Sequence, residues 1–170
     1  PGAVKIQVDI DPCEINKNVP VDQYIVGDVK DFLQRLLPQV QPNTHPDWRE
    51  EIARWQEQQE KVAYRGGSLH PGRLIRDVCD MAEQDAIFVT DVGQHQMWAA
   101  QYVKHQKPRR FLSSGGLGTM GYGYGAAIGA QAAFPGRRVV HFTGDASFHM
   151  NMNEACTAVS QKLPIITVIF

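Results

Sequence analysis

The spacing of hydrophobic residues divides the chain into regions of different texture. Residues 4–11 alternate apolar and polar side chains, which predicts a β-strand, and a second short strand is expected at 24–26. Asp28 can cap a following helix whose apolar face lies between Phe32 and Leu37. Residues 1–37 therefore predict the β-α tail of a Rossmann-like domain, too small to hold a core alone.

A polar, proline-rich stretch comes next, and residues 38–69 are predicted to form a linker that carries one amphipathic helix. Trp48, Ile52 and Trp55 lie at helical spacing, which favours a surface helix packed through its two indoles. Gly66-Gly67 is expected to end this helix.

From residue 70 onward, short helices and strands alternate. Strands are expected at 86–90, 111–112, 139–142 and 165–170, and helices over 71–81, around 97–102, over 120–133 and over 147–161. This alternation predicts right-handed βαβ units and a parallel sheet, whose apolar final strand is expected in the buried middle. The predicted fold class is α/β: a doubly wound parallel sheet, here incomplete, preceded by the β-α tail.

Composition narrows the class of protein without indicating a function. The chain has 17 basic and 18 acidic residues and a net charge of -1, so nothing indicates binding to nucleic acid or to an anionic membrane. Cys13, Cys79 and Cys156 lie far apart and form no metal-binding or disulfide pattern, which favours a reducing compartment. No apolar run reaches transmembrane length. We therefore expect a cytoplasmic protein, or an organellar one if a longer precursor carries a transit peptide.

Three turns each follow a predicted strand and precede a predicted helix. Residues 116–121 fit G-x-G-x-x-G, which alone is a weak sign of dinucleotide binding and fits a tight turn as well. At the second turn, the Asp145 carboxylate can bind Mg²⁺, and the following amides with the Ser147 hydroxyl can bind a diphosphate. Spacing alone equally allows Asp145 to do no more than cap the helix. The third turn, residues 91–95, has the same placement, although His95 alone is more typical of a structural residue. All three turns could converge on one ligand.

Four strings in this order and spacing resemble the catalytic subunit of acetohydroxyacid (acetolactate) synthase, a thiamine-diphosphate enzyme. They are residues 90–98, 108–111, 114–121 and 144–148. Gly144-Asp145 alone would indicate only a thiamine-diphosphate enzyme, whereas 93–97 and 115–121 narrow the resemblance to the acetolactate branch. The opening residues 8–15 resemble the end of that family's middle domain, so the resemblance covers essentially the whole chain. It implies that 1–37 end the middle domain, that 38–69 are a linker, and that 70–170 begin the thiamine-diphosphate (pyrophosphate-binding) domain.

The resemblance also implies a role for individual residues. Asp145 would be a ligand of Mg²⁺. The cofactor-binding positions would be Val92, Gly93, Gln94, His95, Gly118, Met120, Gly144, Ala146, Ser147 and Met150. Within this set, the Gly118 carbonyl and the Met120 amide would bond the aminopyrimidine, and the Met120 side chain would support the bent cofactor. No catalytic residue is assigned here, because the family's activating glutamate lies in another domain of a neighbouring subunit.

The implied activity is decarboxylation of pyruvate and carboligation to a second 2-oxoacid, a transferase reaction of branched-chain amino-acid biosynthesis. The intact subunit would form a homodimer or homotetramer, with FAD and a regulatory small subunit as open questions. The 170-residue chain alone is expected to be inactive, because the activating glutamate and the second metal ligand expected beyond Phe170 are not in it. Two alternatives stay open: another thiamine-diphosphate enzyme, such as pyruvate oxidase or glyoxylate carboligase, and a non-catalytic nucleotide-binding module.

Overall fold

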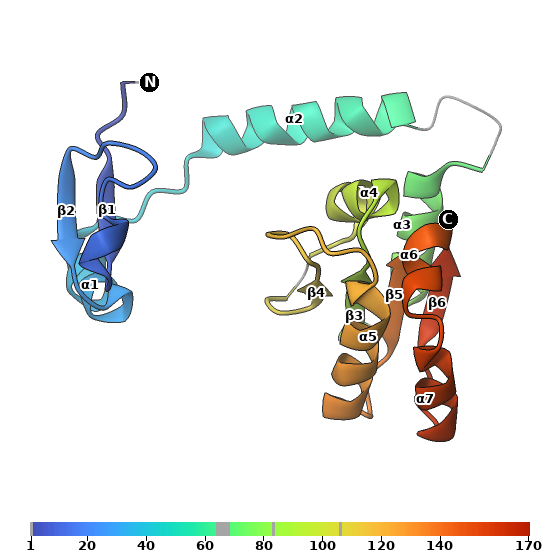
Figure 1. Cartoon of the computed structure of the whole chain (residues 1–170). Coiled ribbons are helices and arrows are strands. Elements are labelled where there is room, and N and C mark those ends of the chain that lie inside the picture. The colour runs from blue at the N-terminus through green and yellow to red at the C-terminus, as the bar shows by residue number, and fades with distance from the viewer. Residues whose placement is uncertain (1, 64–68, 83, 106) are drawn as a thin grey trace. The chain divides into compact units, whose positions relative to one another are not determined.

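The structure is a computed structural model that describes residues 2–63, 69–82, 84–105 and 107–170. It contains two compact units, residues 1–53 and 54–170, each of which is described by itself (Figure 1). The three-part division at residues 37 and 69 stays a prediction, and Gly66-Gly67 lies outside the described residues. Within the described ranges, no helix has the length and apolar character that crossing a bilayer requires.

The first unit is a small β-α structure, as predicted. Strand β1 (Ile6–Asp9) pairs in parallel with β2 (Gln23–Val26), and the 3₁₀-helix η1 (Pro12–Glu14) lies between them in sequence. Helix α1 (Val29–Leu36) begins after Asp28, whose carboxylate accepts hydrogen bonds from two first-turn amides at 2.7 and 3.1 Å, and η2 (Leu37–Gln39) follows. None of residues 2–53 is buried, which agrees with a segment too small to hold a core.

Helix α2 (Pro46–Ala63) spans the junction of the two units in sequence, and its existence was predicted from the spacing of Trp48, Ile52 and Trp55. The side chains behave differently from that prediction. Trp48 and Trp55 are 61% and 54% exposed, so more than half of each indole is open rather than packed.

The second unit is built on a parallel sheet of order β4-β3-β5-β6 (Figure 1). The strands are β3 (Ile87–Thr90), β4 (Phe111–Leu112), β5 (Val139–Thr143) and β6 (Ile166–Ile169). The predicted α/β class with a parallel sheet is confirmed. The predicted middle position of the last strand is wrong for the described sheet, because β6 pairs only with β5 and leaves Ile166 and Ile169 exposed.

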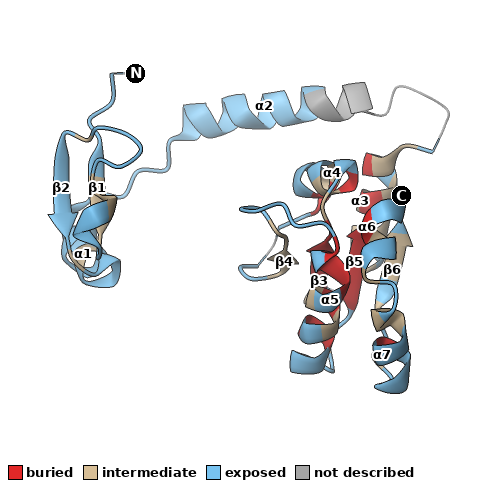
Figure 2. Ribbon diagram, viewed as in Figure 1, coloured by how far each residue is buried: buried red, intermediate tan, exposed pale blue. Residues whose placement is uncertain are grey.

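Helices cover both faces of this sheet. They are α3 (Pro71–Met81), α4 (Gln94–Tyr102), α5 (Tyr122–Ala133), α6 (Asp145–Met150) and α7 (Glu154–Ser160). Phe88 and Phe142 pack on one face with residues of α3 and α4, while Ile87 and Val89 pack on the other with α5. Buried residues gather on β3 and β5, the two central strands (Figure 2). The carboxyl ends of these two strands, Thr90 and Thr143, are therefore part of the buried core.

Two helix predictions need correction. The single helix predicted over 147–161 is two helices, α6 and α7, separated by residues 151–153. The side-chain amide of Asn151 donates to the carbonyl of Gly121, a distant contact that holds the chain where the break occurs. The helix predicted to begin at Met120 begins at Tyr122, because Gly121 has a φ of 88° and cannot be part of a right-handed helix.

Candidate functional site

The three predicted turns meet around one pocket at the carboxyl ends of β3 and β5. Its volume is about 280 Å³. It is lined by Val92, Gly93, Gln94, His95, Trp98, Met120, Gly144, Asp145, Ala146, Ser147 and Phe170. The structure thus brings together every predicted cofactor or metal residue except Gly118 and Met150. This is the edge at which open α/β sheets bind their ligands.

The turn after β3 is held by a buried carboxylate. Asp91 is fully buried, and its backbone N–H continues the sheet by donating to the Phe142 carbonyl at 2.9 Å. Its carboxylate accepts hydrogen bonds from three backbone amides, those of Val92 at 2.9 Å, Gly121 at 2.8 Å and Gly123 at 3.1 Å. The turn after β3 and the start of α5 are therefore joined through one side chain.

The turn after β5 presents one exposed carboxylate and one buried hydroxyl. Asp145 is the first residue of α6 and is exposed at the pocket. Ser147 is 1% exposed, and its hydroxyl donates to the Val92 carbonyl at 2.7 Å. The Ser147 side chain thus joins two turns. Its hydroxyl hydrogen is used in this bond, so the groups of Ser147 that are left for a ligand are the lone pairs of the hydroxyl oxygen and the backbone N–H.

The ring of His95 is enclosed between two glycines of different turns. A Cβ atom at Gly93 would lie 2.9 Å from this ring and would clash with it, whereas one at Gly144 would lie 3.1 Å away and would need the ring to shift by a few tenths of an ångström. His95 is 4% exposed, and its Nε2 has no hydrogen-bond partner among the described residues. Burial lowers the pKa of His95, and the nearby Asp91 charge opposes this shift. The pocket wall therefore holds an imidazole that favours its neutral form.

The two predicted residues outside the pocket lining lie beside it. Gly118 has a φ of 65°, and a Cβ there would lie 3.8 Å from Val92, so its backbone runs next to the pocket wall. Met150 is 55% exposed, and its Cβ lies 3.1 Å from where Gly121 would carry its own. The structure therefore places Met150 against the Gly121 backbone rather than in the pocket lining.

Trp98 and Phe170 line the pocket without having been predicted. Their ring centroids are 6.0 Å apart, and together they form an apolar wall. Trp98 follows Gln94 by four residues and His95 by three, so helical periodicity would have placed it on the same face. Phe170 follows β6, and its amide donates to the Thr143 carbonyl at 2.9 Å, which puts it at the same sheet edge.

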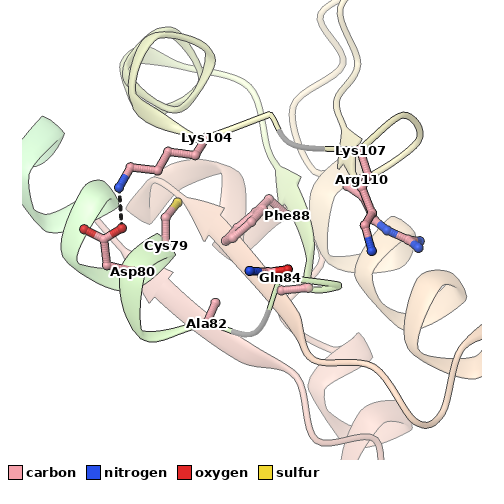
Figure 3. A pocket seen from close by; sticks show the side chains of 9 residues that line it. Cys79, Asp80, Ala82, Gln84, Phe88, Lys104, Lys107 and Arg110 are labelled. Atoms are coloured by element: carbon pink, nitrogen blue, oxygen red, sulfur yellow. Dashed lines mark hydrogen bonds and ion pairs between the residues drawn. The ribbon is translucent and has the colours of Figure 1, made fainter.

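A second cavity, of about 220 Å³, lies near the amino end of β3 (Figure 3). It is lined by Cys79, Asp80, Ala82, Gln84, Ala86, Phe88, Lys104, Lys107 and Arg110. Lys104 pairs with Asp80, and Lys107 pairs with Asp85, so most of its charge is neutralised within the protein. None of the predicted site residues lines this cavity. The pocket at the carboxyl ends of the strands is therefore the candidate site.

The candidate pocket suits a diphosphate that carries a divalent cation. Among the described residues no group of three or more His, Cys, Asp or Glu could hold a metal alone, so a cation at Asp145 needs further oxygen ligands. Mg²⁺ is commonly bound in this way, by one or two carboxylates together with phosphate oxygens. First-turn amides of α6 have no acceptor within the helix and can meet phosphate oxygens. The His95 Nε2 is buried and has no hydrogen-bond partner among the described residues.

Comparison with known proteins also indicates a site for a diphosphate cofactor. Residues 91–170 match the family described as thiamine pyrophosphate enzyme, C-terminal TPP binding domain; thiamine pyrophosphate is another name for thiamine diphosphate. The chain is 46% identical over 175 residues to the acetolactate synthase large subunit of Porphyra purpurea, covering 99% of this chain and 29% of that protein. It is 40% identical over 176 residues to the acetolactate synthase isozyme 3 large subunit of Escherichia coli K12, covering 99% and 31%. The chain thus spans less than a third of these relatives' length.

Proposed function

We propose that this chain forms part of the thiamine diphosphate site of an acetolactate synthase. The chain belongs to the thiamine pyrophosphate enzymes through residues 91–170. It is also related along nearly its whole length to acetolactate synthase large subunits. The observation that carries this proposal is the single pocket that gathers the three turns. It combines one exposed carboxylate with the free amides at the start of α6.

In this proposal each part of the pocket has a distinct task. Asp145 binds Mg²⁺, and the amides of Ala146 and Ser147 with Gln94 and His95 hold the diphosphate. The backbone at Gly118 and Met120 binds the aminopyrimidine. Met150 contributes through the Gly121 backbone that it contacts, since it does not line the pocket.

When bound, thiamine diphosphate supplies a thiazolium ring that serves as the electron sink for decarboxylation. The residues of this chain would position that ring and keep water away from it; Trp98 and Phe170 provide the apolar wall for this purpose. The substrates of the whole enzyme would be pyruvate and a second 2-oxoacid, within branched-chain amino-acid biosynthesis. The same proposal includes an oligomeric state of homodimer or homotetramer and a small regulatory subunit. It also includes FAD in the intact enzyme and a cytoplasmic or organellar location.

Ligand binding separates this proposal from its alternatives. Isothermal titration of the full-length protein with thiamine diphosphate plus Mg²⁺, with NAD⁺ and with FAD should give tight, metal-dependent binding of the first. Colorimetric detection of acetolactate from pyruvate then distinguishes a synthase from a pyruvate oxidase or glyoxylate carboligase. Binding of NAD⁺ without thiamine diphosphate would instead support a nucleotide-binding module.

That the 170-residue chain is inactive by itself stays a prediction. Within the pocket the described residues supply one carboxylate for a metal and no glutamate next to the proposed aminopyrimidine position. Incubating the purified chain with pyruvate, thiamine diphosphate and Mg²⁺ should give no acetolactate above a protein-free control. Turnover above that control would show that the chemistry needs fewer groups than we infer.

A further inference from the structure

The peptide groups around Gly121 are held from two sides by side chains that do not line the pocket. The Gly121 N–H donates to the Asp91 carboxylate, and its carbonyl accepts from the Asn151 side-chain amide. Asp91 follows β3, while Asn151 follows α6, so the two contacts come from different segments of the chain. We call these two side chains, Asp91 and Asn151, the Gly121 clamp.

Asp91 also supplies a hydrogen-bond acceptor for the free amides at the start of α5, where the capping residue has no side chain. Gly121 is the residue that precedes the first turn of α5, a place where Ser, Thr, Asp or Asn usually satisfies the free amides, but glycine has no side chain to do so. The Asp91 carboxylate takes this role from 30 residues upstream by accepting from the Gly121 and Gly123 amides. Its negative charge at the amino end of the helix is also favoured by the helix dipole.

The backbone leaves the clamp little freedom. Gly121 has a φ of 88°, and a Cβ there would lie 3.1 Å from Met150 and 3.2 Å from the Asn151 amide. The residue before it, Met120, lines the pocket. Any movement of the Gly121 peptide therefore moves Met120 relative to the turns after β3 and β5.

We propose that Asp91 and Asn151 are positioning residues, which act through Gly121 to hold Met120 and the Gly118 carbonyl at the place where the aminopyrimidine binds. Neither side chain is among the residues that line the pocket. The consequence for binding rests on the proposed cofactor site, whereas the ordering of the loop by the clamp is a property of the protein alone.

The α5 helix offers a matched control at its other end. Gln131 is fully buried, and its side-chain amide donates to the carbonyls of Phe134, Pro135 and Arg137 at 3.3, 3.5 and 2.9 Å. Asp91→Asn replaces one accepting oxygen by an NH2 group and removes the negative charge at the start of α5, and Gln131→Ala removes the side-chain hydrogen bonds at its end. Only the first of these ends faces the pocket.

Amide hydrogen exchange tests the clamp without any cofactor. In the full-length protein, Asp91→Asn should accelerate exchange at Gly121 and Gly123 by about tenfold or more, since hydrogen bonds to a charged acceptor are worth at least that factor. Gln131→Ala should leave these two amides at wild-type rates. Asn151→Ala, in which a partly exposed side chain is shortened, should loosen residues 118–121 and is expected to fold even if Asp91→Asn does not. Wild-type exchange at residues 118–123 in both clamp variants would overturn the proposal.

Titration with thiamine diphosphate and Mg²⁺ tests the consequence. We expect the dissociation constant to rise about tenfold in Asp91→Asn and to stay within twofold of wild type in Gln131→Ala. Equal weakening in both variants would mean that Asp91 only stabilises the fold, and the positioning role would be wrong. If the wild-type protein itself fails to bind thiamine diphosphate, the proposed function fails, and the clamp is then judged on the exchange rates.

Discussion

The hydroxyl of Ser147 donates a hydrogen bond to the carbonyl of Val92 at 2.7 Å, although the two residues are 55 positions apart. Val92 belongs to the turn after β3, and Ser147 belongs to the first turn of α6 after β5. The bond joins the turns that follow the two central strands. Ser147, which was expected to bind the ligand, therefore also has a structural role in holding these turns together.

Ser147→Ala should therefore destabilise the protein. The half-buried Val92 carbonyl would lose its partner, and a typical hydrogen bond contributes about 0.5–1.5 kcal/mol to stability. Urea unfolding followed by circular dichroism measures this change. Ser160→Ala is the matched control, because the Ser160 hydroxyl is exposed and bonds within its own helix end. Equal losses of unfolding free energy in the two variants would show that the Val92 contact contributes nothing special.

Asp145→Ala should remove Mg²⁺-dependent binding of thiamine diphosphate by the full-length protein and leave the fold intact. The side chain is exposed, and among the described residues that line the pocket it is the one carboxylate. Calorimetric titration with and without Mg²⁺ measures the effect. Glu154→Ala provides the control, since Glu154 is also acidic and in a first helical turn, that of α7, but lies outside the pocket. Wild-type affinity in Asp145→Ala would refute the assignment of the metal ligand.

Substitutions along α5 should differ in sign according to what each glycine faces. A Cβ at Gly123 would lie 2.5 Å from the His141 Nε2 and 2.8 Å from the Asp91 backbone nitrogen, so Gly123→Ala should lower the unfolding free energy by about 1–3 kcal/mol. At Gly125 and Gly129 a Cβ would meet no other described atom within 4 Å apart from the neighbouring residues and the backbone of the helix itself. Alanine at either should instead raise the unfolding free energy, by up to about 1 kcal/mol. Thermal unfolding of the three variants checks the order, which would be contradicted if Gly123→Ala were neutral.

Stability should fall in mild acid because of His141. This residue is fully buried without a hydrogen-bond partner for either ring nitrogen among the described residues, and burial lowers its pKa from 6.5 to about 4. Between these two pH values the unfolded chain binds a proton that the folded chain does not, so the unfolding free energy decreases as pH falls from 6.5 to 4. The contribution of this residue is at most about 3 kcal/mol.

Urea unfolding at a series of pH values between 7 and 4 measures this slope. His141→Gln should flatten it, whereas His149→Gln, which changes an exposed histidine, should leave it unchanged. An identical slope in the wild type and in His141→Gln would assign the acid sensitivity to other groups. His95, whose pKa is also lowered by burial, is the next candidate and acts with the same sign.

Local patterns predicted the parallel sheet and the convergence of three turns at its edge, whereas the individual cofactor residues were implied by the family resemblance. Buried parallel strands such as Ile87–Thr90 are continuous apolar runs, and a turn after such a strand must lie at the carboxyl edge of the sheet. Gly93, Asp145 and Ser147 could therefore be placed together from their neighbours alone. Trp98 was within reach of the same reasoning, since it shares a helical face with His95.

What the sequence did not predict depends on contacts between distant segments. The break between α6 and α7 lies at Asn151, whose side chain bonds to Gly121 30 positions away. The position of Met150 beside the Gly121 backbone depends on the same contact. Helical periodicity continues through 147–161, so no local pattern distinguishes one helix from two. The three hydrogen bonds that the Asp91 carboxylate accepts from backbone amides could not be predicted from local patterns either. Two of these amides belong to α5 and to the turn before it, which are 30 or more positions away.

The ring of His95 lies between Gly93 and Gly144, and a Cβ atom at either position would come within 3.1 Å of it. Gly93 also has a φ of 151°, so a side chain there is strained whatever residue stands at position 95. At Gly144 a methyl group would require the ring to shift by a few tenths of an ångström. Across homologous sequences, position 93 should therefore stay glycine, whereas the residue at 144 should depend on the size of the side chain at 95, although 95 and 144 belong to different turns.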